Sequence, residues 1–241
     1  MNLHIQLITL EETPDRERNA VKELNGIPHT VHRFKKMSPG WKGCVDSHLQ
    51  VYRKNISLET IFICEDNILF TNEPQFKYAN LLKFMKTCPD WGIIFVGGYI
   101  ARPWGYCKET KYPQVYETRG NNHGTVSYII HSRLFKEILK VNAISPISKP
   151  IDCFLSQYTN YIYNPLMFYH SHTSKSTINA YLDPLRRVWF HPKMMKFHHL
   201  IFFNRMWLYI LLVIISGGLW WVLKRRRRVP STKSQFLADV M

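Results

Sequence analysis

Short apolar runs alternate with amphipathic stretches along residues 1–170. The segment 3–10 is rich in Leu and Ile, and Ile61-Phe62-Ile63-Cys64 is a compact apolar run without polar interruption. The first pattern predicts a strand, and the second predicts a strand that is buried on both faces. Related patterns predict further strands at 29–34, 91–96, 125–131 and 166–169.

Helix signals fall between these strands. Thr13 can cap a helix that begins at Pro14, and Gly26 can end it, which predicts a helix over 14–25. Further helices are expected at 43–55, 76–88, 132–141 and 152–158, whereas 99–124 is rich in Gly, Pro, Tyr and charge and is expected to be irregular. Strands that alternate with helices predict an α/β fold with a mostly parallel central sheet.

The C-terminal part of the chain has a different pattern. Residues 206–223 contain no charge, and Arg205 and the cationic run 224–228 flank them. At about 1.5 Å per residue this length is close to the hydrocarbon thickness of a bilayer, and tryptophans lie near both of its ends. The pattern predicts one C-terminal transmembrane helix; a buried core helix is the alternative. The expected organisation is a domain at 1–180, a basic juxtamembrane segment at 181–205, the span at 206–223 and a basic tail at 224–241.

The net charge of +15 is distributed unevenly along the chain. Residues 1–180 contain 21 Lys and Arg against 15 Asp and Glu, whereas residues 181–241 contain 11 against 2. A basic excess at one end indicates a membrane surface or a function of the tail, and membrane lipid is an expected partner. No basic stripe interleaved with aromatic residues is present on the domain, so nucleic acid is not an expected partner. An alternative hypothesis places the function itself in 181–241, along anionic headgroups.

The five cysteines are widely spaced and include no CxxC pair. This spacing argues against a disulfide framework and against a zinc site, and it favours reduced thiols in a domain that faces the cytosol. The N-terminal apolar stretch is too short to predict a secretory signal. The expected localisation is therefore a single-pass membrane protein with a C-terminal anchor and with its domain facing the cytosol. The cations at 224–228 alone would favour the opposite orientation, with the tail in the cytosol.

The strand at 61–64 ends in the polar residues Glu65-Asp66-Asn67. In open α/β sheets, ligands bind outside the carboxyl ends of the strands, and oxygen ligands there can hold Mg²⁺ or Mn²⁺. Side chains alternate along an extended chain, so Glu65 and Asn67 are expected to share a face that Asp66 does not. A simple turn is the alternative interpretation of such a strand end.

The neighbouring motifs resemble those of glycosyltransferase family 25, the group of lipopolysaccharide and procollagen-type sugar transferases. The resemblance covers 3–180 and rests on five segments in order: Pro14-Asp15-Arg16, Gly43-Cys44-Val45-Asp46-Ser47-His48, the strand that ends in Glu65-Asp66-Asn67, Gly124-Thr125-Val126-Ser127-Tyr128, and Pro150-Ile151-Asp152. It implies a GT-A-like fold, a nucleotide-sugar donor that is commonly UDP-linked, a divalent metal, Mn²⁺ or Mg²⁺, and transfer to a hydroxyl of a glycan or protein acceptor.

Carried over by position, the resemblance implies roles for several residues of these motifs. Glu65, Asp66, Asn67, Ser47 and His48 are expected to bind the donor, Asp152 and Asp66 to act in catalysis, with Asp152 as an acceptor-binding group or general base, and Glu65 and Asn67 to bind the metal. Apart from the resemblance, His170 or His172 after the last predicted strand could add a metal ligand, because neutral imidazole suits Mn²⁺; ordinary surface histidines are the alternative. Asp152 could instead be a helix cap, and His48 could instead be a packing residue.

The family's last acidic residue is Asn67 in this chain, so the metal face lacks one negative charge. An amide oxygen can still ligate a hard cation, but more weakly than a carboxylate does. The departure leaves two hypotheses: an active, membrane-anchored glycosyltransferase, or a catalytically inactive relative that serves as a membrane-bound binding or scaffold protein.

Overall fold

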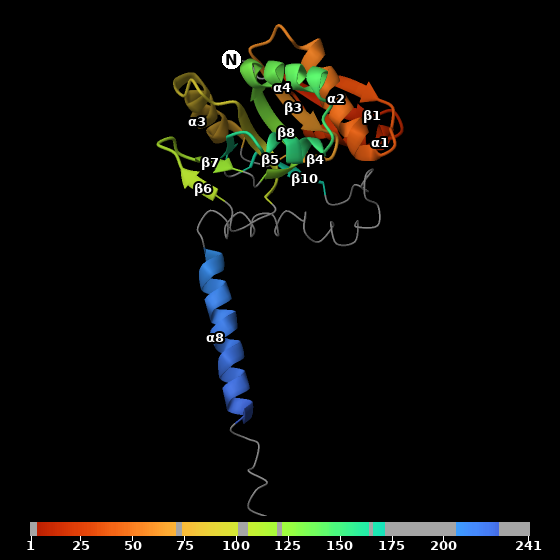
Figure 1. Cartoon of the computed structure of the whole chain (residues 1–241). Helices are drawn as coiled ribbons and strands as arrows, with labels where there is room; N and C mark the ends of the chain where they lie inside the picture. Colours follow the sequence, from red (N-terminus) through yellow and green to blue (C-terminus); the bar gives the residue numbers. More distant parts are fainter. Residues whose placement is uncertain are drawn as a thin grey trace, which may run out of the picture. The chain divides into compact units, whose positions relative to one another are not determined.

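A ten-stranded sheet forms the centre of the first of two units into which the chain divides, residues 1–199 and 200–241 (Figure 1). The computed structural model describes residues 4–70, 74–100, 106–119, 122–163, 166–171 and 206–226. Each unit is described by itself.

Seven strands of the sheet point in one direction: β1 (Ile5–Leu10), β2 (His29–Phe34), β3 (Thr60–Glu65), β5 (Ile93–Ile100), β6 (Tyr106–Glu109), β9 (Asn160–Tyr163) and β10 (Phe168–His170). Three run the opposite way: β4 (Ile68–Phe70), β7 (Val115–Arg119) and β8 (Asn122–His131). The order is β2-β1-β3-β8-β5-β9-β7-β6, and β10 pairs with β4 and β5. The α/β fold with a mostly parallel sheet is confirmed, with β8 inserted antiparallel between β3 and β5.

The register of the parallel strands brings their carboxyl ends to one level. β1 pairs with β2 and with β3, and Ile8 of β1 lies beside Glu65, the last residue of β3. Since parallel strands end at the same edge of a sheet, polar residues that follow β1 and β3 gather there.

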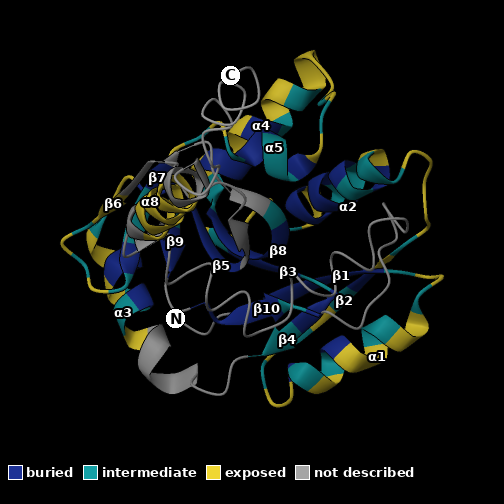
Figure 2. Ribbon diagram, turned by 90° about the horizontal axis from the view of Figure 1, so that it is seen from below, coloured by how far each residue is buried: buried dark blue, intermediate teal, exposed yellow. Residues whose placement is uncertain are grey.

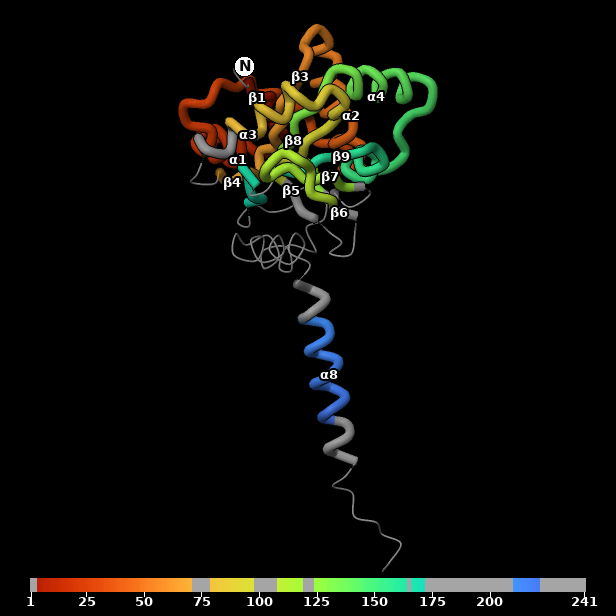
Figure 3. The backbone as a smooth tube through the Cα atoms, turned by 90° about the vertical axis from the view of Figure 1, so that its left-hand side faces the viewer, coloured from red at the N-terminus to blue at the C-terminus, as the bar shows by residue number. Residues whose placement is uncertain are grey.

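Helices cover the sheet on two faces. On one face α1 (Pro14–Glu23) and α3 (Pro74–Thr87) contribute Ala20, Leu81 and Phe84 to a core that contains Ile5 and Phe62 of the sheet. On the other face α2 (Gly40–Lys54) contacts α4 (Ser132–Ile144) and α5 (Ile151–Leu155). Figure 3 shows α2 and α4 side by side. Figure 2 shows the consequence: the central strands β1, β3, β5 and β8 are largely buried, and the helices expose their outer sides to solvent.

Most predicted elements are present, with boundaries displaced by a few residues. The prediction of an irregular segment over 99–124 is wrong, because β6 and β7 form a hairpin there and β8 begins at Asn122. The hairpin turn includes Gln114 at φ 69°, and β7 extends the sheet by pairing with β9. β4 and β9 were not predicted; both are short, and their pairing with β10 and β5 depends on residues far away in the sequence.

The second unit contains α8 (Met206–Arg226), so the helix predicted over 206–223 is present and extends to Arg226. Its described side chains are those of residues 210–221, and its large apolar side chains there are exposed. Within the described part of the chain, no helix is both long enough and apolar enough to span a membrane. The predicted basic segment 181–205, the tail beyond Arg226 and His172 lie outside the described residues.

Candidate active site at the ends of β1 and β3

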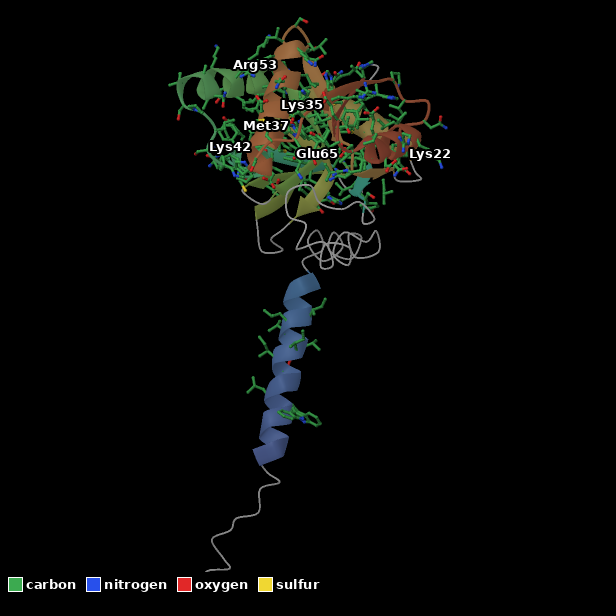
Figure 4. The ribbon with its side chains drawn as sticks, turned by 90° about the vertical axis from the view of Figure 1, so that its right-hand side faces the viewer. Lys22, Lys35, Met37, Lys42, Arg53 and Glu65 are labelled. Atoms are coloured by element: carbon green, nitrogen blue, oxygen red, sulfur yellow. The ribbon has the colours of Figure 1, made fainter. Side chains whose placement is uncertain are left out.

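A cavity of about 80 Å³ lies where β1 and β3 end. It is lined by the end of β1, the first turn of α1, the connection from β2 to α2, the first turns of α2 and the end of β3: Ile8, Thr9, Leu10, Arg16, Lys36, Met37, Gly40, Gly43, Cys44, Ser47, His48, Glu65 and Asp66. Figure 4 labels Glu65 at this strand end and Met37 on the β2–α2 connection. The cavity therefore lies at the sheet edge where ligands bind in α/β folds.

Asp66 is held on the α1 side of this edge. Its carboxylate pairs with the guanidinium of Arg16 and accepts hydrogen bonds from the hydroxyls of Thr9 (2.8 Å) and Thr13 (3.2 Å). Its side chain is only 5% exposed. Burial raises the pKa of the Asp66 carboxyl above its ordinary value, although Arg16 and Thr9 oppose this shift. Because three donors already surround its carboxylate, Asp66 is suited to a structural role in the cavity wall.

Glu65 faces α2, the opposite side. Thr125 donates a hydrogen bond to its Oε1, and Nε2 of His48 lies 3.6 Å from the same oxygen. Burial favours the neutral acid, but the contacts with His48 and Thr125 outweigh it and lower the pKa of the Glu65 carboxyl. Glu65 and Asp66 thus point to opposite faces, as the strand period predicts, and both reach the cavity.

His48 links this carboxylate to the core of the domain. Its ring is fully buried, Nδ1 lies 2.6 Å from the hydroxyl of Tyr128, and that hydroxyl lies 2.7 Å from the hydroxyl of Tyr52. The rings of His48 and Tyr128 also stack, with centroids 5.7 Å apart. His48 is therefore a packing residue of the core, one of the two interpretations that the sequence left open, and it also lines the cavity.

Cys44 is a site residue that the sequence analysis did not select. One potential ligand atom from each of Cys44, His48 and Glu65 lies within 4.8 Å of the others. Burial, with the nearby carboxylates of Glu65 and Asp152, raises the pKa of the Cys44 thiol. A signal for this cluster was available, because positions 44 and 48 are four residues apart on a predicted helix.

Ser47 lines the cavity but uses its hydroxyl locally. The hydroxyl donates to the carbonyl of Gly43 at 2.7 Å, one turn earlier in α2. Gly43 in turn permits close packing, since a Cβ at this position would lie 3.0 Å from Cβ of Met37. Gly43 thus allows the start of α2 to pack closely against Met37 on the β2–α2 connection, which lines the cavity.

Asp152 is in the first turn of α5, and Pro150 occupies the capping position. The carboxylate accepts the backbone N–H of Cys153 (2.8 Å) and of Gly124 (3.0 Å), whose φ of 96° favours glycine. Thr125, the next residue, binds Glu65. Gly124 and Thr125, consecutive residues of β8, therefore position the carboxylates of Asp152 and Glu65 respectively.

Asn67 contacts His170 on β10. Its Nδ2 lies 3.0 Å from Nε2 of His170, while Nδ1 of His170 lies 2.8 Å from the carbonyl of Ser171. This arrangement fits a neutral imidazole that donates from Nδ1 and accepts at Nε2. Oδ1 of Asn67 is buried and has no hydrogen-bond partner among the described residues.

A family model described as glycosyltransferase family 25 (LPS biosynthesis protein) matches residues 5–155, more than half of the chain. The chain belongs to glycosyltransferase family 25. The cavity residues from β1 to β3 all lie within the matched segment. None of the curated proteins compared with the sequence matches it.

Three solved structures resemble this glycosyltransferase family 25 member at low sequence identity. A glycosyltransferase involved in the glycosylation of the major capsid of PBCV-1 is 13% identical, with a TM-score of 0.44 over 76% of this chain and 97% of that chain. A197 from STIV is 15% identical, with a TM-score of 0.42 over 70% and 85%. UDP-glucose pyrophosphorylase complexed with UDP-glucose is 13% identical, with a TM-score of 0.41 over 69% and 75%.

The hard-cation site that the family resemblance implies does not fit the side chains at this position. Asp66 is bound by Arg16 and two hydroxyls, and Nε2 of His170 is bound by the amide of Asn67. Mg²⁺ and Mn²⁺ prefer several oxygen ligands, and of the three residues predicted to bind metal only Glu65 offers a carboxylate. Glu65, Asn67 and His170 are therefore not assigned as a Mg²⁺ or Mn²⁺ site.

Proposed function

We propose that this glycosyltransferase family 25 member transfers a sugar from a nucleotide-sugar donor, commonly UDP-linked in the family, to a hydroxyl of a glycan or protein acceptor. The observation that carries the proposal is the cavity at the ends of β1 and β3, which lies inside the segment that matches the family. Its wall carries Glu65 and Asp66 together with the cationic side chains of Arg16 and Lys36.

Arg16 and Lys36 are the two cationic residues in the cavity wall, and we assign them to the diphosphate of the donor. Guanidinium and ammonium groups bind phosphate oxygens and stabilise the charge that develops on a leaving diphosphate. Asp66 holds Arg16 in place, so it acts in donor binding as a positioning residue. This assignment differs from a direct catalytic role for Asp66, because the donors around its carboxylate leave it poorly suited to proton transfer.

Asp152 is the carboxylate that we assign to the acceptor. Taking the acceptor's proton as the new glycosidic bond forms requires a carboxylate close to the donor cavity. Asp152 is held at Gly124, beside the residue that holds Glu65. The reaction is then a displacement at the sugar carbon, with the acceptor oxygen entering and the diphosphate leaving.

Attachment to membrane lipid through α8, with the domain on the cytosolic side, is part of the proposal. It is supported by the uncharged sequence 206–223, the flanking cations and the exposed apolar side chains at 210–221. Flotation of the full chain with lipid vesicles tests it. Replacing Val213 with Arg should reduce flotation, and an unchanged fraction on vesicles would contradict attachment through α8.

A donor panel with the full chain tests the transferase proposal. A UDP-sugar should raise the melting temperature and should be hydrolysed slowly without acceptor. Glu65→Gln should abolish hydrolysis, whereas Glu59→Gln, whose side chain is 82% exposed just before β3, should retain it. Absence of both a thermal shift and turnover with every donor would overturn the proposal.

Asn67 supports a second candidate, an inactive relative that binds ligands as a membrane-bound scaffold. Its amide is bound to His170 where the family's carboxylate would stand. A donor that raises the melting temperature but is neither hydrolysed nor transferred would favour this candidate.

A further inference from the structure

Three side chains of different chemistry meet beside the cavity, and we call them the Cys44–His48–Glu65 cluster. Cys44 and His48 lie one helical turn apart on α2, and Glu65 ends β3. One potential ligand atom from each residue lies within 4.8 Å of the others. The cluster differs from the set Glu65, Asn67 and His170, with which it shares only Glu65.

The second observation is the buried imidazole nitrogen of His48. The His48 side chain is 0% exposed, and its Nε2 has no hydrogen-bond partner among the described residues. Oε1 of Glu65 lies 3.6 Å from this nitrogen, beyond a normal hydrogen bond. A buried nitrogen without a partner lowers stability, and such groups often indicate an ion or water that would satisfy them.

Outer contacts orient the cluster. The 2.6 Å contact between Nδ1 of His48 and the hydroxyl of Tyr128 fixes the ring, and with the proton on Nδ1 it leaves a lone pair on Nε2. Thr125 holds the carboxylate of Glu65 from β8. Metal-bound histidines characteristically have such a partner on their other ring nitrogen.

We propose that Cys44, His48 and Glu65 form a binding site for one zinc-class divalent ion, with its fourth position open to the cavity. Sulfur, imidazole and carboxylate together suit Zn²⁺ or Co²⁺, whereas Mg²⁺ prefers oxygen ligands. A tetrahedral zinc ion with Zn–N and Zn–O bonds of about 2.0–2.2 Å has these ligand atoms roughly 3.3–3.6 Å apart, and the 3.6 Å separation of Nε2 of His48 and Oε1 of Glu65 lies at the upper end of this range.

The open position faces the cavity because all three residues line it. An ion there would meet an oxygen ligand that enters the cavity, such as water or a phosphate oxygen. The site itself does not depend on the proposed transferase activity, and its test uses no turnover, so the two proposals can fail separately.

Cobalt titration of the full chain tests the site after extraction with a chelator. Wild-type protein should bind about one equivalent of Co²⁺, give a sulfur-to-cobalt charge-transfer band in the near ultraviolet, and lose that band when Zn²⁺ is added. Cys44→Ser should abolish the band. Cys88→Ser, at the end of α3 outside the cluster, should keep it.

Two further variants separate metal binding from folding. His48→Asn keeps a polar group near Nδ1 and removes Nε2, so it should lose Zn²⁺ binding while the metal-free protein still unfolds cooperatively. Tyr128→Phe removes the outer partner and should weaken Zn²⁺ binding by about 10–100-fold. The proposal is overturned if wild-type protein gives no cobalt band, or if folded Cys44→Ser or His48→Asn protein binds Zn²⁺ as tightly as wild type does.

Discussion

Arg16 pairs with Asp66, a residue 50 positions later in the chain, and thereby joins α1 to the end of β3. The side chains are 16% and 5% exposed, so both charges are largely removed from water. A buried charge that loses its partner is costly, because neither water nor the protein then compensates for it.

Arg16→Met should therefore destabilise the protein by about 3 kcal/mol at neutral pH, as measured by urea unfolding. Without Arg16 the pKa of Asp66 rises further, so the folded variant takes up a proton and the loss should shrink as the pH falls. Arg18→Met is the matched control, since its pair with Asp15 is exposed and should contribute less than about 0.5 kcal/mol. Equal losses for the two variants would contradict the buried pair.

Replacing Asp152 with Asn distinguishes proton transfer from a structural role. If Asp152 takes the acceptor's proton, the rate of sugar transfer should fall by about 10²–10⁴-fold while the donor affinity stays the same. The two backbone N–H groups bind different oxygens of the Asp152 carboxylate, and asparagine has an NH₂ group in place of one of them. One of the two hydrogen bonds is therefore lost, and the free energy of unfolding should also fall by about 1–3 kcal/mol. Steady-state kinetics of folded protein with a fixed donor measures the difference. Loss of donor affinity with a retained rate would assign Asp152 to the shape of the site instead.

Asn67→Asp restores the charge that the family motif carries. The added carboxylate should make donor binding respond to Mn²⁺, with about a tenfold gain in affinity, which corresponds to about 1.4 kcal/mol. This gain is modest beside the roughly 4 kcal/mol of two opposite unit charges 4 Å apart at an effective dielectric constant of 20. Donor titrations with and without Mn²⁺ measure it. Asn142→Asp keeps the oxygen that accepts from Ile147 and should show no gain; an equal response in both variants would exclude a local effect.

His32 should make stability depend on pH. Burial, and secondarily Lys54, lowers the pKa of His32 below its ordinary value of 6.5, and the ring nitrogen Nε2 lies 2.7 Å from Oε1 of Gln6. Between the lowered folded pKa and 6.5, the unfolded chain binds the proton more readily than the folded chain does, so stability falls as the pH falls. The contribution of one such group is at most about 1.4 kcal/mol per pH unit.

Urea unfolding at about pH 7.5 and about pH 5.5 measures this slope. His32→Gln should be less stable than wild type at the higher pH, and the difference should narrow at the lower pH. A difference that is constant across the range would show that the protonation of His32 is not linked to folding.

The sequence alone determined the order of most elements and the location of the candidate site. The apolar run at 61–64 and its polar end predicted β3, and the strand period predicted that Glu65 and Asp66 point to opposite faces. These features follow from local rules, because periodicity and capping depend on residues a few positions apart. The family motifs, which lie within the matched segment 5–155, also predicted that the candidate site lies at the end of β3.

Only the tertiary structure decided which side chains meet at those strand ends. Asn67 and His170 are 103 positions apart, and His48 and Tyr128 are 80 positions apart. The first contact depends on the pairing of β10 with β4, and the second on the insertion of β8 beside β3 and on the packing of α2. No local pattern specifies these arrangements. The β6–β7 hairpin was missed for the same reason, since its strand β7 is stabilised by pairing with the distant β9. Local periodicity fixes the direction of a side chain, whereas its partner is set by packing between distant elements.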